Sequence, residues 1–505
     1  MKKRTKLSLV LSSLAAIAIA GATMAGGTYA LFTSESKVNI ADNSGKVDVK
    51  ASIEDLSVYS PTEISTGEGN EITNSDNSAN ADTKTFVNGG TASLDTNGAL
   101  TLSKVTPGDK VSFTFKLKNE SNVKAQYRIV ISCDEDDGLF NGLEVKLGDT
   151  TGLSFAQKVP GITTITKYAS IEENSDDLSV PMTIELPTTA GNEYQDKKCK
   201  IVFKVEAIQG NAKVSDPEEG VLELYNKTDL VSYGKLEGNW NSVTFDNTSP
   251  LYGYKTIKLM NDIDLNNEEW TPLSNLRMTF DGNNKTIKNL KIDGNNSKGN
   301  NLGLFAKIQG PYANQSVAAV KDLTIENVDI TNGTSQIGAL TGYSNGLIEN
   351  VSVKGSIKMI GQEYIGAIVG KTYENELKNC SVDGGSKDTS YIKAQSGEQK
   401  NIGGIAGWTN DGSDGTIISD CSVKNISLYG KKTIGGITST TQNNGSISNC
   451  TVENVDIKVS AASNDHVGEI LGRYVLNGNV QTTIPEEKVT NCTATNVNIT
   501  YNNLF

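Results

Sequence analysis

The sequence predicts an all-β protein in which an antiparallel sandwich is followed by a parallel β-helix of irregular rungs. Alternating apolar residues in the first half indicate strands with one buried face. A short apolar pattern in the second half recurs at intervals typical of stacked repeats. The composition fits a loop-rich β protein, because 6% of the residues are aromatic and 49 are glycine. A chain of 505 residues is long enough for two or three domains.

The recurring pattern is clearest from Ile447 to Val452 (ISNCTV) and reads apolar, any residue, Asn or Asp, apolar, any residue, small apolar. Its seven copies begin about 28 to 42 positions apart, at Ile287, Val320, Ile348, Leu377, Ile418, Ile447 and Val489. A glycine-rich pattern such as Ile402 to Gly407 (IGGIAG) alternates with it. One repeat of two short strands cannot bury its own apolar face. We therefore expect the repeats to stack by parallel pairing, about 4.8 Å apart.

The Asn or Asp of each copy is expected at a corner between two strands, since Asn tolerates left-handed backbone better than most residues. Further corners are expected at Asn327, Asn425, Asn496 and Gly355. The aligned copies predict a hydrogen-bonded ladder along one corner, formed by Asn289, Asp322, Asn350, Asn379, Asp420, Asn449 and Asn491.

The repeats resemble the GLUG-motif family of large bacterial surface proteins. The resemblance rests on the Ile-Gly-Gly-Ile-x-Gly segments and on Gly-x-Ile-x-Asn-Cys-x-Val segments such as Gly445 to Val452. It covers roughly Leu222 to Ile499 and implies a β-helix but no particular activity, because one fold carries many functions. We assign 222–505 to this β-helix, with a short helix at 226–231 capping its first rung, and 211–221 to a linker.

Residues 1–30 are expected to be an export signal. A basic start (MKKRTK) precedes an apolar run from Leu7 to Ala20 and a small-residue site at Thr28-Tyr29-Ala30, so a signal peptidase is expected to cut between Ala30 and Leu31. The alternative is an uncleaved membrane anchor, for which the apolar run is short.

The net charge of -13 argues against nucleic acid as a partner.

Residues 31–210 are expected to form the sandwich. Val111 to Leu117 and Tyr127 to Ile131 alternate in the manner of strands, and Ile201, Phe203 and Val205 mark a last strand. The polar stretch 60–82 is expected to be a flexible insertion.

This region resembles the TasA/camelysin family of exported fibre proteins of Gram-positive bacteria. The matching segments are Gly26 to Phe32, Ser44 to Val49, and Pro107-Gly108-Asp109-Lys110 before the strand at Val111. The resemblance implies a jelly-roll-like sandwich, a dedicated signal peptidase and self-assembly by strand addition, in which a new N-terminus completes the sheet of a neighbouring subunit. The donor-strand candidates are Leu31, Phe32, Val38 and Ile40, and the alternative is a disordered leader.

The six cysteines fall into two groups. Cys380, Cys421, Cys450 and Cys492 occupy one core position of four repeats, and we expect a stack of buried free thiols rather than a metal site or disulfides. Cys133 ends one predicted strand and Cys199 begins another. Because export permits oxidation, these two are disulfide candidates, with two isolated core thiols as the alternative.

The sequence offers no catalytic or metal-binding constellation, and we expect no cofactor. The one histidine, His466, has no partner signature, and there is no His-Glu-x-x-His motif. Asp134 to Asp137 lack the spacing of an EF-hand loop, and Asp262 and Asp264 alternate with apolar residues as the outer face of a strand.

We therefore expect a non-enzymatic, extracellular protein of the cell surface or biofilm matrix, in which the sandwich provides assembly or attachment and the β-helix is a stiff display surface. One alternative is an adhesin that binds surface glycans or matrix proteins, with Tyr391, Trp408, Tyr429 and Tyr474 as candidate stacking platforms. Another is a carbohydrate-active β-helix enzyme with a groove built from the loops at 383–400 and 474–488.

Overall fold

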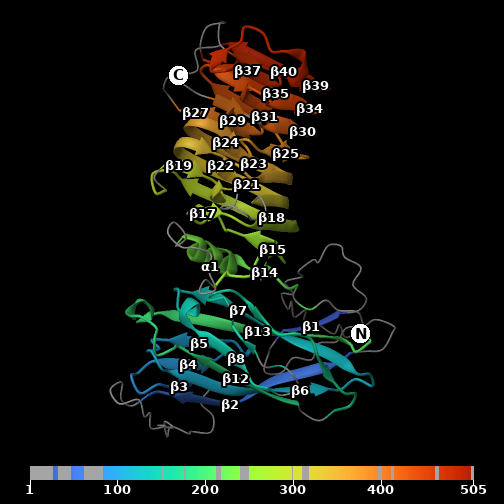
Figure 1. The fold of residues 1–505 in the computed structure, drawn as a ribbon. Helices are drawn as coiled ribbons and strands as arrows, with labels where there is room; N and C mark the ends of the chain where they lie inside the picture. The colour runs from blue at the N-terminus through green and yellow to red at the C-terminus, as the bar shows by residue number, and fades with distance from the viewer. Residues whose placement is uncertain are drawn as a thin grey trace, which may run out of the picture.

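The computed structural model describes residues 27–31, 47–61, 83–149, 153, 155–157, 159–175, 178–211, 216, 218–238, 250–297, 299–309, 318–395, 401–410, 415–460 and 466–501. For 27–31 it describes the backbone alone. The fold is all-β, with an antiparallel sandwich and a parallel β-helix, and this prediction is confirmed (Figure 1). Most of the signal segment, residues 32–46 and 62–82 of the expected insertion lie outside the described residues. Ser60, placed in that insertion, is instead buried and donates to Asp109 Oδ1 at 2.6 Å.

Two antiparallel sheets form the sandwich. The first has the order β10-β7-β13-β5-β4-β3, with β1 beside β13 and β11 beside β7, and the second has the order β2-β6-β12-β8-β9. The strands of the first sheet are β1 (Gly27–Leu31), β3 (Thr83–Thr85), β4 (Thr91–Leu94), β5 (Leu100–Ser103), β7 (Ala125–Asp136), β10 (Thr164–Ile165), β11 (Ala169–Ile171) and β13 (Lys198–Gln209). Those of the second are β2 (Val49–Tyr59), β6 (Lys110–Asn119), β8 (Glu144–Leu147), β9 (Phe155–Ala156) and β12 (Leu178–Glu185).

The alternating residues of these strands fill the space between the two sheets. Phe113 and Phe115 of β6 and Phe203 of β13 meet edge to face, with ring centroids 5.3 to 5.4 Å apart. Such pairs add stabilisation beyond the apolar area that they bury. The period-two pattern of the sequence therefore places one aromatic cluster between the two layers.

The β-helix consists of a 19-stranded sheet and an 8-stranded sheet, parallel throughout except for the last hairpin, β37–β38. The larger sheet contains β14 (Val221–Leu224), β15 (Thr256–Leu259), β16 (Ile263–Asp264), β18 (Thr279–Asp293), β19 (Asn300–Leu302), β21 (Ala319–Ile337), β23 (Leu347–Gly366), β25 (Glu376–Lys378), β26 (Ser381–Asp383), β27 (Tyr391–Ala394), β28 (Asn401–Gly403), β30 (Ile417–Ser419), β31 (Ser422–Gly430), β32 (Thr433–Gly435), β34 (Ser446–Ser448), β35 (Thr451–Val459), β36 (Val467–Gly468), β39 (Val489–Thr490) and β40 (Thr493–Tyr501). The smaller contains β17 (Leu273–Leu276), β20 (Phe305–Ile308), β22 (Thr341–Ser344), β24 (Val369–Tyr373), β29 (Ala406–Asn410), β33 (Thr438–Gln442), β37 (Leu471–Leu476) and β38 (Asn479–Val480).

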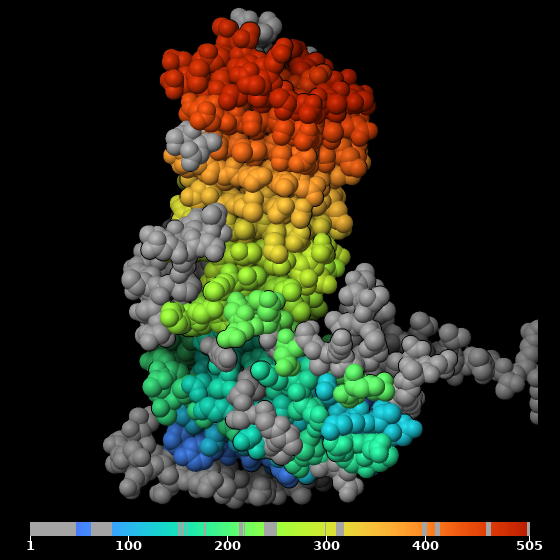
Figure 2. Space-filling view, turned by 45° about the vertical axis from the view of Figure 1, so that its right-hand side comes forward, coloured from blue at the N-terminus to red at the C-terminus, as the bar shows by residue number. Residues whose placement is uncertain are grey.

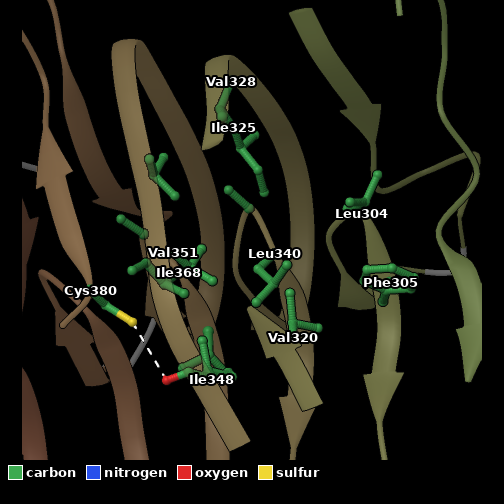
Figure 3. Packing of buried hydrophobic residues seen from close by; sticks show 14 of the residues in the cluster. Leu304, Phe305, Val320, Ile325, Val328, Leu340, Ile348, Val351, Ile368 and Cys380 are labelled. Atoms are coloured by element: carbon green, nitrogen blue, oxygen red, sulfur yellow. Dashed lines mark hydrogen bonds between the residues drawn. The ribbon is translucent and has the colours of Figure 1, made fainter. Parts of the chain in front are cut away.

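The apolar positions of successive rungs stack into one core. Val320, Ile348 and Leu377 pair in register and are fully buried, and Figure 3 shows how such side chains layer between the sheets. The glycine-rich pattern forms the tight turns that lead from the larger sheet to the smaller. A Cβ on Gly403 would lie 1.9 Å from the carbonyl oxygen of Ala406. Glycine is needed there because no side chain fits.

A helix and a loop of the sandwich close the first rung. Helix α1 (Lys227–Gly238) begins after Asn226, whose Oδ1 accepts the backbone N–H of Asp229 at 2.9 Å, a typical N-cap. Val159 and Ile162, from the loop before β10, belong to the same buried cluster as the β-helix residues. Figures 1 and 2 show the β-helix standing on the sandwich at this joint. The sandwich thus completes the solenoid cap.

Candidate functional site

Two asparagine ladders, rather than one, run along the corners of the β-helix. In the first, Asn350 Nδ2 donates to Asp322 Oδ1 at 2.8 Å and Asn379 Nδ2 to Asn350 Oδ1 at 2.6 Å. The same corner holds Asp420, which accepts from Asn449 Nδ2 at 3.1 Å. All seven residues of the predicted ladder have a left-handed backbone, with φ between 51° and 61°.

The predicted place of Asn289 in the first ladder is wrong. Leu290 pairs with Val328, so Asn289 lies level with Asn327, whose Nδ2 donates to Asn289 Oδ1 at 3.1 Å. Asn289 therefore belongs to the second ladder. The later rungs of that ladder hold Asn425, Asn454 and Asn496, and the bonds that link these three are 2.8 and 3.0 Å long.

Charged side chains on the outer face of the larger sheet alternate in sign from rung to rung. The register brings together Lys288, Glu326, Lys354, Asp383, Lys424 and Glu453 in that order. The ion pairs Lys354–Glu326 and Lys424–Asp383 measure 3.6 and 3.3 Å. Because like charges directly opposite destabilise a sheet, this alternation favours the observed register.

The side of β13 that faces away from β7 is the edge on which the expected cleavage site lies. One side of β13 pairs with β7 along its length, and the other pairs with β5 over Lys198–Ile201 only. Beyond that point β1 covers the edge, from Gly27 opposite Ile208 to Leu31 opposite Lys204 (Figure 1). The expected cleavage site between Ala30 and Leu31 thus lies inside the strand that covers this edge. Of the donor-strand candidates, Phe32, Val38 and Ile40 lie outside the described residues.

The structure holds all six cysteines as free thiols, so the candidate bridge between Cys133 and Cys199 is not formed. A register irregularity after Lys200 sets Cys199 opposite Asp136, and Cys133 opposite Ile201. The two thiols remain neighbours in the core. Burial, together with the Cys133 thiol, raises the pKa of Cys199 well above its ordinary value.

The four β-helix thiols stack on successive rungs. The backbone N–H of Cys380 donates to Cys421 Sγ at 3.4 Å, and that of Cys450 donates to Cys492 Sγ at 3.4 Å. Figure 3 shows the Cys380 thiol directed at the Ile348 carbonyl, 3.7 Å away. Three of these thiols are buried and Cys492 is half-buried. Their surroundings are those of small core side chains.

The four aromatic residues proposed as a stacking platform do not share one face. Tyr391 and Tyr429 meet edge to face on the larger sheet, with ring centroids 6.3 Å apart. Trp408 lies on β29 of the smaller sheet, and Tyr364, near the end of β23 of the larger sheet, stacks on it with ring centroids 4.7 Å apart. Tyr474 is 3% exposed and its hydroxyl donates to the carbonyl oxygen of Asn443, so its assignment as a platform is wrong.

The sequence reading missed three residues around Trp408, namely Tyr364, Lys371 and Arg473. Lys371 Nζ lies 4.7 Å from the Trp408 ring centroid, and Arg473 Nε donates to Thr440 Oγ1 at 3.0 Å. A sequence signal does exist. Lys371, Trp408 and Arg473 each directly follow the last glycine of a glycine-rich copy, and all three are partly exposed.

A groove of about 460 Å³ lies between the acidic end of β7 and helix α1. Its lining contains both acidic and basic side chains, with Asp134, Asp136, Lys227 and Glu268 among the residues.

Within the described ranges, no three His, Cys, Asp or Glu side chains are grouped so as to hold a metal ion. His466, the one histidine of the chain, is exposed. In the part of the chain that the structure describes, no helix is long and apolar enough to cross a bilayer.

Comparison with known proteins gives partial matches only. No protein-family model matches the chain, and the two family resemblances remain predictions. A segment of 99 residues is 35% identical to Halomucin of Haloquadratum walsbyi, which amounts to 20% of this chain and 1% of that protein.

Two solved structures are also similar over part of the chain. A family two carbohydrate esterase from Cellvibrio japonicus is 8% identical over 41% of this chain and 47% of its own, with a TM-score of 0.14. The xylanase 10B CBM22-1–GH10 modules of Clostridium thermocellum, in complex with xylohexaose, are 8% identical over 33% and 32%, with a TM-score of 0.12. These scores support neither a shared fold nor a shared activity.

Proposed function

We propose that this chain is an exported structural protein of the cell surface or extracellular matrix, without enzymatic activity. In this proposal the sandwich assembles by strand addition at the β13 edge, and the β-helix is a stiff display surface. The partial match to Halomucin fits a location at or outside the cell surface. The resemblances to the TasA/camelysin and GLUG-motif families, and a Gram-positive source, belong to the same proposal.

The observation that carries the proposal is the position of β1. Cleavage after Ala30 removes Gly27–Ala30 and leaves Leu31 as the last residue of this pairing. The backbone of β13 from Val205 to Ile208 then presents unpaired N–H and C=O groups, the kind of edge that recruits another strand. Residues 31–40 of a neighbouring copy are numerous enough to cover this edge, since five residues already cover it in this chain.

The display role is supported by the continuity of the β-helix. A single buried cluster runs from the sandwich loop at Val159 to Leu471 on the last rungs. Hydrogen-bonded ladders follow two corners, and ion pairs link neighbouring rungs. In a solenoid held by contacts between neighbouring rungs, each rung fixes the position of the next, so the whole array is stiff.

Electron microscopy of the mature chain, 31–505, tests the proposal beside a chain that begins at residue 41. We expect filaments from the first and none from the second. The double variant Val38→Asp/Ile40→Asp should abolish assembly, because both side chains lie on one face of the donor segment. Asn39→Asp, which adds a charge to the opposite face, should leave it intact. Filaments from the chain that begins at residue 41 would refute strand addition.

A further inference from the structure

The outer column of the smaller sheet concentrates aromatic and cationic side chains. Lys307, Tyr343, Lys371 and Trp408 stand on successive strands in direct register. Ala406 pairs with Thr438 and Thr440 with Arg473, which places Thr440 and Arg473 on the next two rungs of the same column. We call the part from Lys371 to Arg473, together with Tyr364, the Trp408 face.

The side chains of the Trp408 face support one another. Tyr364 and Trp408 stack with an interplanar angle of 23°. Lys371 Nζ lies over both rings, 4.7 Å from the centroid of Trp408 and 5.7 Å from that of Tyr364. Such cation–π contacts hold an ammonium group without neutralising it. The Arg473 guanidinium is held through its Nε, and its two terminal nitrogens have no hydrogen-bond acceptor among the described residues.

The two cations of this face have no carboxylate partner among the described residues. By contrast, Lys354 and Lys424 on the larger sheet each pair with an acidic residue. Burial lowers the pKa of both Lys371 and Arg473, and no carboxylate opposes this effect. The nearby Glu363 lies beside Tyr364 and forms no ion pair with either cation. Both cations are half-buried, in a chain whose net charge is -13.

The indole N–H of Trp408 is a third donor without a partner among the described residues. Trp408 Nε1 is buried and has no hydrogen-bond acceptor in the described part of the chain. A buried N–H without a partner is costly unless a ligand or water accepts it. The face therefore presents two kinds of donor, ammonium and guanidinium, beside flat apolar rings, whereas the indole N–H is buried.

We propose that the Trp408 face binds an acidic polysaccharide through its carboxylate groups. Ammonium and guanidinium groups are the usual partners of carboxylates, and the aromatic rings offer apolar surface to the sugar faces. Lys371 and Arg473 stand on the first and the last of four successive rungs. The three steps between them, at about 4.8 Å each, span about 14 Å. This span suits an extended polymer rather than one sugar. The proposal does not depend on strand addition at the β13 edge.

Binding of polygalacturonate to the full mature chain tests this assignment, with the fully methyl-esterified polymer as the neutral match. The mature chain should bind the acidic polymer at least tenfold more tightly than the ester. Equal binding of the two polymers would overturn the role of the carboxylates. Poly-glutamate that competes as well as polygalacturonate would overturn the assignment to a polysaccharide.

Two double variants separate this face from general electrostatics. Lys371→Gln/Arg473→Gln should lower the affinity for polygalacturonate at least tenfold. Lys354→Gln/Lys424→Gln removes the same two charges from the larger sheet and should change the affinity less than twofold. Equal losses in both would overturn the proposal.

A measurement on the unaltered chain guards against misfolded variants. Amine labelling read by mass spectrometry should show Lys371 protected by polygalacturonate, and Lys354 labelled equally with and without it. Labelling of Lys371 that the polymer does not change would contradict the site, whatever the variants do.

Discussion

Asp229 is the buried carboxylate that joins helix α1 to the sandwich. It is 1% exposed and accepts the backbone N–H and the hydroxyl of Thr163, at 2.7 and 2.6 Å, and the backbone N–H of Tyr225, at 2.7 Å. Asp229→Ala leaves these three donors without an acceptor. At about 1–3 kcal/mol for each unsatisfied buried group, and without full additivity, the expected loss in free energy of unfolding is about 3–5 kcal/mol.

The same residue gives the joint a pH dependence. Burial raises the pKa of Asp229 from 3.8 to about 6, while the bonds from Thr163 and Tyr225 oppose the increase. The folded chain therefore holds this proton more tightly than the unfolded chain. The resulting stabilisation is fully present below pH 3.8 and is lost as the pH rises through about 6, a decrease of at most about 3 kcal/mol.

Urea unfolding between about pH 4 and pH 7, followed by tryptophan fluorescence, measures this effect. Asp229→Asn does not titrate, so the stability advantage of the unaltered chain over this variant should shrink between about pH 4 and pH 6. Glu268→Gln removes an exposed ion pair with Lys227 on the same helix and serves as the control, with an unfolding midpoint close to that of the unaltered chain. Parallel pH profiles for the unaltered chain and Asp229→Asn would refute the reasoning.

Three further predictions concern the β-helix. Gly403→Ala should lower the free energy of unfolding by about 3 kcal/mol, because the added Cβ would lie 1.9 Å from the carbonyl oxygen of Ala406. Thermal unfolding measures this loss, and an unchanged melting temperature would contradict the tight turn. Asn350→Ala should cost about 2 kcal/mol in urea unfolding, since it removes the bond to Asp322 and places Ala at a φ of 54°, and Asn350→Gly should recover about half of this loss. Native chain should react fastest with Ellman's reagent at Cys492, the one half-buried thiol, and unfolded chain should titrate six thiols, whereas four would indicate a disulfide.

Much of the fold could be predicted from local patterns, because period-two alternation and glycine-rich turns are recognised from residues that are close together in the sequence. The strand predicted at Val111 to Leu117 is found as β6, and the apolar slots of the repeats are core positions. The error at Asn289 has a physical cause. Both corners of a rung require a left-handed residue, so the segment around Asn289 resembles the repeats at either corner, and only the observed pairing with Asn327 decides between them.

Site residues were harder to predict, because their partners lie far apart in the chain. Thr163 is 66 positions from Asp229, in a loop without a recognisable pattern. Tyr474 was assigned to the surface as an aromatic residue, but the preceding glycine turn directs Arg473 outward and hence Tyr474 inward. Counting positions from that glycine, rather than searching for aromatic residues, would have selected Lys371, Trp408 and Arg473 together.

One residue of the sandwich lies both at the β13 edge and beside the joint with the β-helix. Glu206 lies opposite Tyr29 of β1 on one side and forms a 2.6 Å ion pair with Arg128 on the other. Arg128 and Glu206 also act electrostatically on Tyr225, which lies just before helix α1. Burial raises the pKa of Tyr225. A strand added at the β13 edge therefore pairs next to the residues that seat the β-helix. Assembly through this edge would fix the position of each β-helix relative to its neighbours, because Glu206 on the edge strand also acts on Tyr225 at the joint.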